Sequence, residues 1–137
     1  MLNKSDDIGA FSSSLRRKEN TNRVLIIEPT QSHQEIFPSL VYYFNSLGFG
    51  VDILLPKVHI ANRQIEFVMS EIESLDVTMY AILCGEHNEY LVRTINTYPY
   101  AYIYFNTAFD LFVGPPAIFF CARITNAREK IFATAHS

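Results

Sequence analysis

From Arg23 onward, short apolar runs alternate with stretches in which apolar residues recur every three or four positions. Residues 24–27 form a wholly apolar, β-branched run, which predicts a strand covered on both faces. A second buried strand is predicted by four apolar residues, Val51, Ile53, Leu54 and Leu55. Between them lies a stripe at helical spacing, which predicts one buried helix face: Ile36, Leu40, Phe44 and Leu47.

Residues that start or stop regular structure mark the ends of these elements. Pro29 cannot donate to a ladder and ends the first strand, and Pro56 ends the second. Ser32 and Glu35 have the capping-box spacing that predicts a helix start, and Gly48 stands where a left-handed C-cap is wanted. A strand, helix and strand of this kind should pair in parallel with a right-handed connection.

The same layout repeats along the rest of the chain. Apolar spacing predicts strands over residues 79–84, 100–105 and 130–135 and helices over residues 63–75, 86–97 and 116–125, with Tyr90, Leu91 and Ile95 of the second of these helices facing inward. The predicted fold class is therefore α/β, a doubly wound, Rossmann-like parallel sheet of about five strands in a single domain, residues 23–137.

Both ends of the chain depart from this alternation. Residues 1–22 are polar and serine-containing and predict a flexible tail, in which a short helix near residues 8–16 would change nothing. The last predicted strand is followed at once by His136 and Ser137, so no closing helix is predicted and we expect a domain truncated at its C-terminus.

Composition narrows the choice of partners. A net charge of −3 over 137 residues argues against nucleic acid, and the one basic run, residues 16–18, predicts a solvated tail with at most peripheral membrane contact. Cys84 and Cys121 lie in apolar segments and predict free thiols in a reducing, cytoplasmic compartment. No secretory signal is visible, and no apolar run is as long as a membrane span.

Ligands of open α/β sheets bind outside the carboxyl ends of the strands, so polar residues there are the candidate site. The loop after the first strand has no glycine, which excludes the dinucleotide fingerprint and the phosphate-binding P-loop, and no cofactor is predicted. The histidines lack metal-site spacing, and no metal is predicted. The strand-end residues are Glu28, Thr30, Gln31, Ser32, His33, Lys57, His59, Glu86, His87, Asn88, Asn106, Thr107, His136 and Ser137.

His33 is the candidate catalytic residue among them. It stands at the predicted helix start, where free N–H groups and the helix dipole favour an anion or a polar ligand. A neutral imidazole there could act as a base or hydrogen-bond a substrate hydroxyl. The alternative is a histidine that only packs on the helix entry.

The stretch VLIIEPTQSHQEIFPSLVYYFNSLGFGVDILL resembles the opening of GT-B-fold glycosyltransferases, with its Leu-Gly-aromatic-x-Val turn at residues 47–51. The segment YIYFNTA, with Asn106 and Thr107, and the segment IFATAHS, with His136, are similar to later strands of that family's N-terminal domain.

This resemblance implies an acceptor-side domain that binds a carbohydrate acceptor. His33 would be catalytic, and the substrate-binding residues would be Thr30, Gln31, Ser32, Glu86, Asn106, Thr107 and His136. The family's second, donor-binding domain is absent from these residues, so the resemblance implies a chain inactive alone, which needs a donor-domain partner or self-associates. Whether the chain is an enzyme by itself stays open.

Two alternatives belong to other functional classes. The same opening stretch also resembles a receiver domain, and Thr107-Ala108 resembles the receiver Thr/Ser-Ala pair. A receiver needs an aspartate at the end of its third strand, where Cys84-Gly85-Glu86 stands, so this would be a degenerate interaction module without the phospho-acceptor. A purely structural or assembly domain without ligand is the remaining alternative.

Overall fold

The computed structural model describes residues 3–5, 8–17, 22–28, 34–56, 63–83, 88–98, 100–106 and 129–132. Within them no helix is long and apolar enough to cross a membrane. The helices and strands of the structure, in chain order, are β1 (Asn3–Ser5), α1 (Ile8–Arg17), β2 (Arg23–Ile27), the 3-10 turn η1 (Gln34–Ile36), α2 (Phe37–Ser46), β3 (Gly50–Pro56), α3 (Arg63–Ile72), β4 (Val77–Leu83), α4 (Asn88–Thr97), β5 (Tyr102–Phe105) and β6 (Glu129–Phe132).

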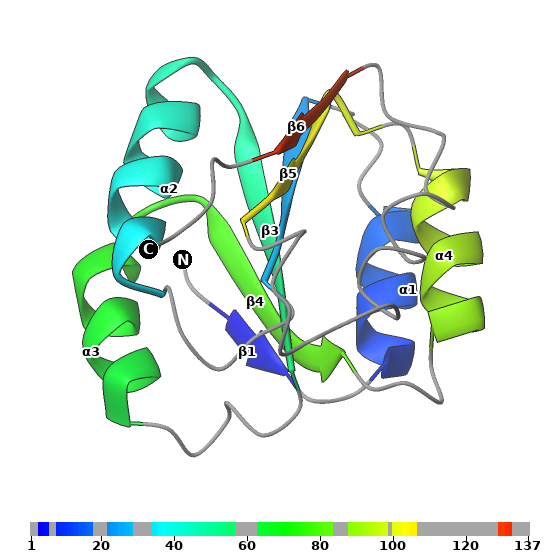
Figure 1. Ribbon diagram of the computed structural model, residues 1–137, viewed down its shortest axis with the longest axis horizontal. Coiled ribbons are helices and arrows are strands. Elements are labelled where there is room, and N and C mark those ends of the chain that lie inside the picture. The colour runs from blue at the N-terminus through cyan, green and yellow to red at the C-terminus, as the bar shows by residue number, and fades with distance from the viewer. Residues whose placement is uncertain are drawn as a thin grey trace.

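The described strands form one sheet in the order β1-β4-β3-β2-β5-β6, and every neighbouring pair is parallel. Helices α2 and α3 cover one face of this sheet, and α1 and α4 cover the other (Figure 1). The predicted doubly wound, Rossmann-like α/β fold is confirmed. The sheet has six described strands where about five were predicted, because β1 adds to the edge beside β4.

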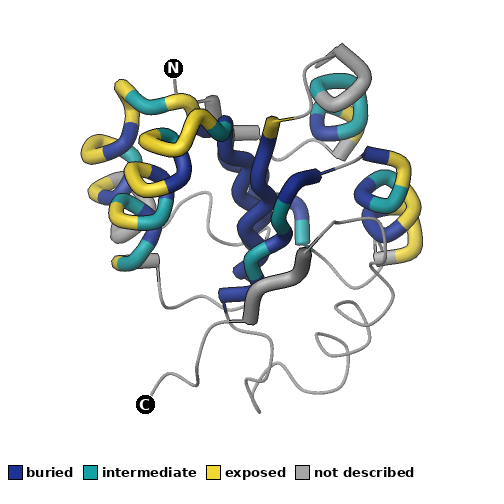
Figure 2. Tube along the Cα trace, turned by 90° about the horizontal axis from the view of Figure 1, so that it is seen from above, coloured by how far each residue is buried: buried dark blue, intermediate teal, exposed yellow. Residues whose placement is uncertain are grey.

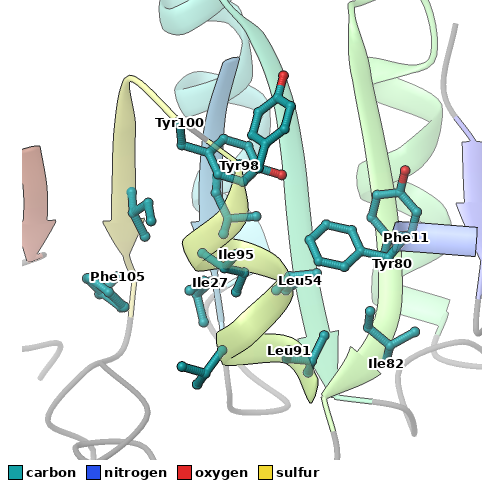
Figure 3. Close-up of a cluster of buried hydrophobic side chains, with 13 residues drawn as sticks. Phe11, Ile27, Leu54, Tyr80, Ile82, Leu91, Ile95, Tyr98, Tyr100 and Phe105 are labelled. Atoms are coloured by element: carbon teal, nitrogen blue, oxygen red, sulfur yellow. The ribbon is translucent and has the colours of Figure 1, made fainter. Parts of the chain in front are cut away.

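The sheet separates the core into two layers, and the central strands are buried throughout (Figure 2). The layer under α2 and α3 is built on Phe37, Val41, Phe44, Val68 and Ile72 from the helices. The opposite layer is richer in aromatic side chains (Figure 3). Its helical and loop members include Phe11, Leu91, Val92, Ile95, Tyr98 and Tyr100.

The two ends of α2 show which local signals decide a helix boundary. Gly48 has φ +89°, its N–H donates to the Asn45 carbonyl at 2.9 Å, and the Phe49 N–H donates to the Phe44 carbonyl at 3.0 Å. This is a Schellman motif, and it confirms the predicted left-handed C-cap. The predicted start was wrong: the N-cap is Ile36, without a side-chain cap, because Pro38 in the first turn favours a start just before it.

The prediction of a flexible tail was wrong for residues 3–5 and 8–17. Strand β1 pairs with β4 through backbone N–H and C=O groups, which any sequence supplies. The polar composition of residues 3–5 therefore does not indicate a strand. Helix α1 places Phe11 against the sheet, fully buried, with its ring centroid 5.0 Å from that of Tyr80 (Figure 3). The buried Phe11 side chain anchors α1 to the core. The polar composition of residues 1–22, taken as a whole, does not reveal this one aromatic residue.

Two residues predicted to face inward lie at the surface instead. Leu47 is 55% exposed, because α2 ends at Ser46 and the chain turns there. Tyr90 is also exposed, while Leu91, Val92 and Ile95 supply the buried face of α4. The predicted helix over residues 116–125 and both cysteines, Cys84 and Cys121, lie outside the described residues.

Candidate functional site

The strand order locates the point at which this sheet can bind a ligand. Without β1, the strands in chain order are arranged 3-2-1-4-5, so the chain first moves outward from β2 through β3 to β4 and then crosses back to β5 on the other side of β2. The switch in direction therefore lies between β2 and β5, which pair in register from Val24 and Tyr102 to Ile27 and Phe105. Open α/β sheets bind ligands outside the carboxyl ends of the strands at this point.

Two polar residues meet at that position. Glu28 follows β2 and Asn106 follows β5, one residue beyond the last register pair in each strand. Asn106 Nδ2 donates to Glu28 Oε1 at 2.7 Å. Both residues are buried: Glu28 is 0% exposed and Asn106 is 1% exposed. Their backbone N–H groups continue the sheet: that of Glu28 donates to the Leu54 carbonyl at 3.0 Å, and that of Asn106 to the Ile27 carbonyl at 2.9 Å.

This pair sets a carboxyl and a carboxamide group in fixed orientation beneath the carboxyl edge of the sheet. A carboxylate accepts hydrogen bonds and carries negative charge, whereas an amide both donates and accepts. Such groups suit ligands rich in hydroxyl or amine donors. Among the described residues no group of three histidine, cysteine, aspartate or glutamate side chains could hold a metal ion.

Of the residues predicted to form the site, Asn106 is placed by the structure at the switch point. The others, Thr30, Gln31, Ser32, His33, Glu86, Thr107 and His136, lie outside the described residues, so their proximity and the roles assigned to them stay predictions. Glu28 is one of the strand-end residues named above, but it is not among the predicted site residues. The signal for it was an acidic residue directly after a wholly apolar strand.

A second buried polar cluster lies at the opposite, amino edge of the sheet, and the sequence reasoning missed it. Asp52 of β3 is fully buried and accepts hydrogen bonds from Arg23 Nη2 at 2.7 Å, Arg23 Nε at 3.3 Å and the Tyr100 hydroxyl at 2.7 Å. Arg23 Nη2 also donates to the Val51 carbonyl at 3.2 Å, and its Nη1 lies 3.6 Å from an oxygen of the exposed Asp76. The signal was an aspartate between Val51 and Ile53 in a buried strand, since such a charge needs a partner.

The electrostatics of this cluster raise the pKa of two of its groups, Arg23 and Tyr100. Burial by itself would lower the pKa of Arg23, but the hydrogen bond and the charge of Asp52 raise it above the ordinary arginine value. Burial, followed by the charge of Asp52 and the hydrogen bond to it, raises the pKa of Tyr100 well above the usual tyrosine value. A charged donor and a neutral donor thus both face Asp52, and the cluster joins β2, β3 and the segment just before β5 at the amino edge of the sheet.

Comparison with known proteins adds the fold and no activity. No known family model matches the sequence, and no curated protein matches it. Among solved structures, histidinol dehydrogenase from Elizabethkingia anophelis is similar, with a TM-score of 0.56 and 12% sequence identity over 82% of this chain. The match spans 27% of that enzyme's chain. At this identity the likeness supports the Rossmann-like α/β fold alone.

Proposed function

We propose that this chain is a carbohydrate-binding domain whose site is the carboxyl edge of the sheet between β2 and β5, and that it serves as the acceptor-side half of a glycosyltransferase. The observation that carries the proposal is the buried Glu28–Asn106 pair at the switch in strand order. In this role the pair forms the floor of the site. The loops that follow β2, β4, β5 and β6 supply the remaining contacts, with His33 as the base.

The chemistry of this edge favours a neutral, hydroxyl-rich ligand. Sugars are recognised by carboxyl and amide groups that accept and donate hydrogen bonds to hydroxyls, and both kinds stand at this point. The loop after β2 has none of the glycines that let a backbone approach a pyrophosphate. The net charge of −3 also disfavours an anionic ligand.

The strand order argues against the receiver alternative. Receiver domains have the flavodoxin-like order 2-1-3-4-5, in which the chain changes direction after its second strand. Here β2, β3 and β4 follow one another outward before the crossover to β5, which is the 3-2-1-4-5 order. Together with the absence of an aspartate at residues 84–86, this leaves the receiver reading without support from either topology or chemistry.

Amide chemical-shift mapping on the full, isotope-labelled chain tests the proposal. Uncharged methyl glycosides of glucose, galactose and N-acetylglucosamine are added at millimolar concentration. We expect at least one to perturb the amides of Glu28, Phe105 and Asn106 at the carboxyl edge, and to leave those of Arg23 and Asp76 at the amino edge unchanged.

Absence of any response to the three glycosides, or a response confined to the amino edge, would refute a carbohydrate site at this position. For a ligand that binds, His33→Ala is expected to weaken binding at least about fivefold if the imidazole hydrogen-bonds a sugar hydroxyl. Unchanged affinity in this variant would assign His33 to packing at the helix entry.

A further inference from the structure

We infer that the solvent-facing side of α2 is a contact surface for a second copy of this chain, which binds it about a two-fold axis. This surface, the α2 face, consists of the exposed residues of α2 and of the turn that follows it: Ser39, Tyr42, Tyr43, Ser46 and Leu47. Helix α2 lies on the side of the sheet opposite α1 and α4 (Figure 1). The inference does not rest on the proposed carbohydrate site.

The residues of the α2 face form one continuous stripe. Spacings of three and four residues bring side chains to the same side of a helix, so Ser39, Tyr43 and Leu47 lie in one row and Tyr42 and Ser46 in the next. The buried residues of α2 lie on its other side and pack on the sheet. Tyr42 is 68% exposed, Tyr43 56% and Leu47 55%. Three large side chains thus point outward together.

The α2 face carries no charge. Among the helices that the structure describes, α2 alone contains no charged residue, and the sequence has none from residue 36 to residue 51. At a two-fold contact each residue near the axis meets its own copy, so a charged residue there would face a like charge. The cores of contacts between identical subunits are accordingly poor in charge and rich in tyrosine. An uncharged tyrosine stripe therefore fits a second copy, whereas a partner recognised by charge would find nothing on α2 to pair with.

The polar groups beside the exposed rings are already bonded within the chain. The Ser46 hydroxyl donates to the Tyr43 carbonyl at 2.6 Å. The Asn45 amide donates to the Phe49 carbonyl at 2.9 Å and to the Asp76 carbonyl at 3.1 Å. The α2 face therefore offers mainly its large side chains to a partner.

Tyr43 is supported by the rings packed beneath it. Its ring centroid lies 5.3 Å from that of Phe44, at an interplanar angle of 69°. Phe44 stacks on Tyr102 of β5 at 6.4 Å, and Phe49 meets the same Tyr102 ring edge-on at 5.6 Å. This connected set of rings ties the exposed Tyr43 to the sheet, so less side-chain freedom is lost when a partner binds. Aromatic side chains near the centre of an interface commonly supply most of its binding energy.

The exposed area indicates how strong the contact is. A tyrosine side chain has roughly 150–250 Å² to bury, so exposures of 68% and 56% leave about 200–300 Å² on Tyr42 and Tyr43. A stable dimer buries about 800 Å² on each copy. The α2 face is therefore the core of a weak, reversible dimer. Exposed acidic residues flank it, Glu35 before α2 and Asp76 beside Asn45, so added salt should screen their repulsion and strengthen the dimer.

Sedimentation equilibrium of the full chain, from about 10 μM to about 1 mM, measures the Kd of the dimer. Tyr43 stands at the middle of the stripe and hence next to the axis. Tyr43→Lys and Tyr43→Glu are each expected to raise Kd at least about tenfold. Tyr90→Lys is the matched control, because Tyr90 is an exposed tyrosine on α4, on the opposite side of the sheet, and it should leave Kd unchanged. Circular dichroism verifies that each variant is folded.

A mixture of variants tests whether the partner is a second copy in a two-fold arrangement. Lysine and glutamate at residue 43 repel their own kind and attract each other. An equal mixture of Tyr43→Lys and Tyr43→Glu should therefore associate at least about tenfold more tightly than either variant alone. In the wild type, Kd should fall as the salt concentration is raised from about 50 mM to about 500 mM.

Four results would overturn the inference. They are a wild-type chain that stays monomeric at about 1 mM, a Kd that Tyr43→Lys leaves unchanged, a Kd that Tyr90→Lys raises as much, and a mixture that associates no more tightly than its components. Should a variant fail to fold, amide chemical shifts of the wild type give the same test. Those of Tyr42, Tyr43 and Leu47 should change with protein concentration and that of Tyr90 should not, and the reverse pattern would equally overturn the inference.

Discussion

Replacing Asp52 by asparagine removes the charge that faces Arg23 and leaves the size of the side chain unchanged. Asp52 is fully buried and accepts three hydrogen bonds, two from Arg23 and one from Tyr100. Asparagine has one oxygen and an NH₂ group, so at least one of these donors would face another donor. The guanidinium would stay buried without its counter-charge.

The size of the effect follows from burial. Removing one partner of a buried ion pair costs about 3–5 kcal/mol, because the other charge stays desolvated. Asp76→Asn is the matched control, since it removes a carboxylate from the same arginine at 3.6 Å, but from a side chain that is 69% exposed. An exposed pair contributes about 0–1 kcal/mol. The two substitutions should therefore differ by roughly 2–5 kcal/mol.

Urea unfolding followed by circular dichroism at 222 nm measures both variants, with the free energy of unfolding taken from the midpoint and the slope m. Equal losses in Asp52→Asn and Asp76→Asn would refute the argument that burial gives this cluster its strength. The triple variant Arg23→Met, Asp52→Leu and Tyr100→Phe replaces every member by an apolar side chain. It should be more stable than Asp52→Asn, because no buried charge is left alone.

Three further predictions concern packing, backbone and pH. Phe11→Ala should lower the free energy of unfolding by about 3–5 kcal/mol, because its side chain is fully buried. Phe67→Ala, at a 66% exposed position, should change it by less than about 0.5 kcal/mol in the same urea assay. Equal effects would contradict the packing of α1 on the sheet through Phe11. Gly50→Ala should destabilise the fold by about 1–3 kcal/mol, because the added Cβ would collide with the guanidinium of Arg23 on the neighbouring strand. Gly48→Ala should destabilise it by about 1–2 kcal/mol through its φ of +89° alone. Thermal melts in which Gly48→Asn is no better tolerated than Gly48→Ala would contradict this conformational explanation for Gly48. The raised pKa of Tyr100 contributes stability that is fully present below about pH 10 and is lost as the pH rises further, because the unfolded chain releases a proton that the native state retains. In Tyr100→Phe the urea midpoint should therefore fall less steeply with alkaline pH than in the wild type. An equally steep fall would refute the assignment of this pH dependence to Tyr100.

Local pattern was sufficient for the alternation of strands and helices. A strand buried on both faces is apolar at nearly every position, and a surface helix is apolar every three or four. Residues 24–27 and, despite Asp52, residues 51–55 could therefore be recognised as strands without knowing their neighbours. Gly48 could be assigned as a C-cap for the same reason, since a left-handed backbone position is a property of one residue. The doubly wound fold class followed from this alternation.

The partners of each strand and of each buried polar group were decided only by the tertiary structure. Glu28 and Asn106 are 78 residues apart and meet because β5 pairs with β2 across the switch in strand order. Arg23 and Asp52 meet because β2 and β3 pair in the register that sets Arg23 beside Gly50. Periodicity reports which face of an element is buried, but not which element covers it. The sequence therefore determined the elements and their class, and long-range pairing determined both polar clusters.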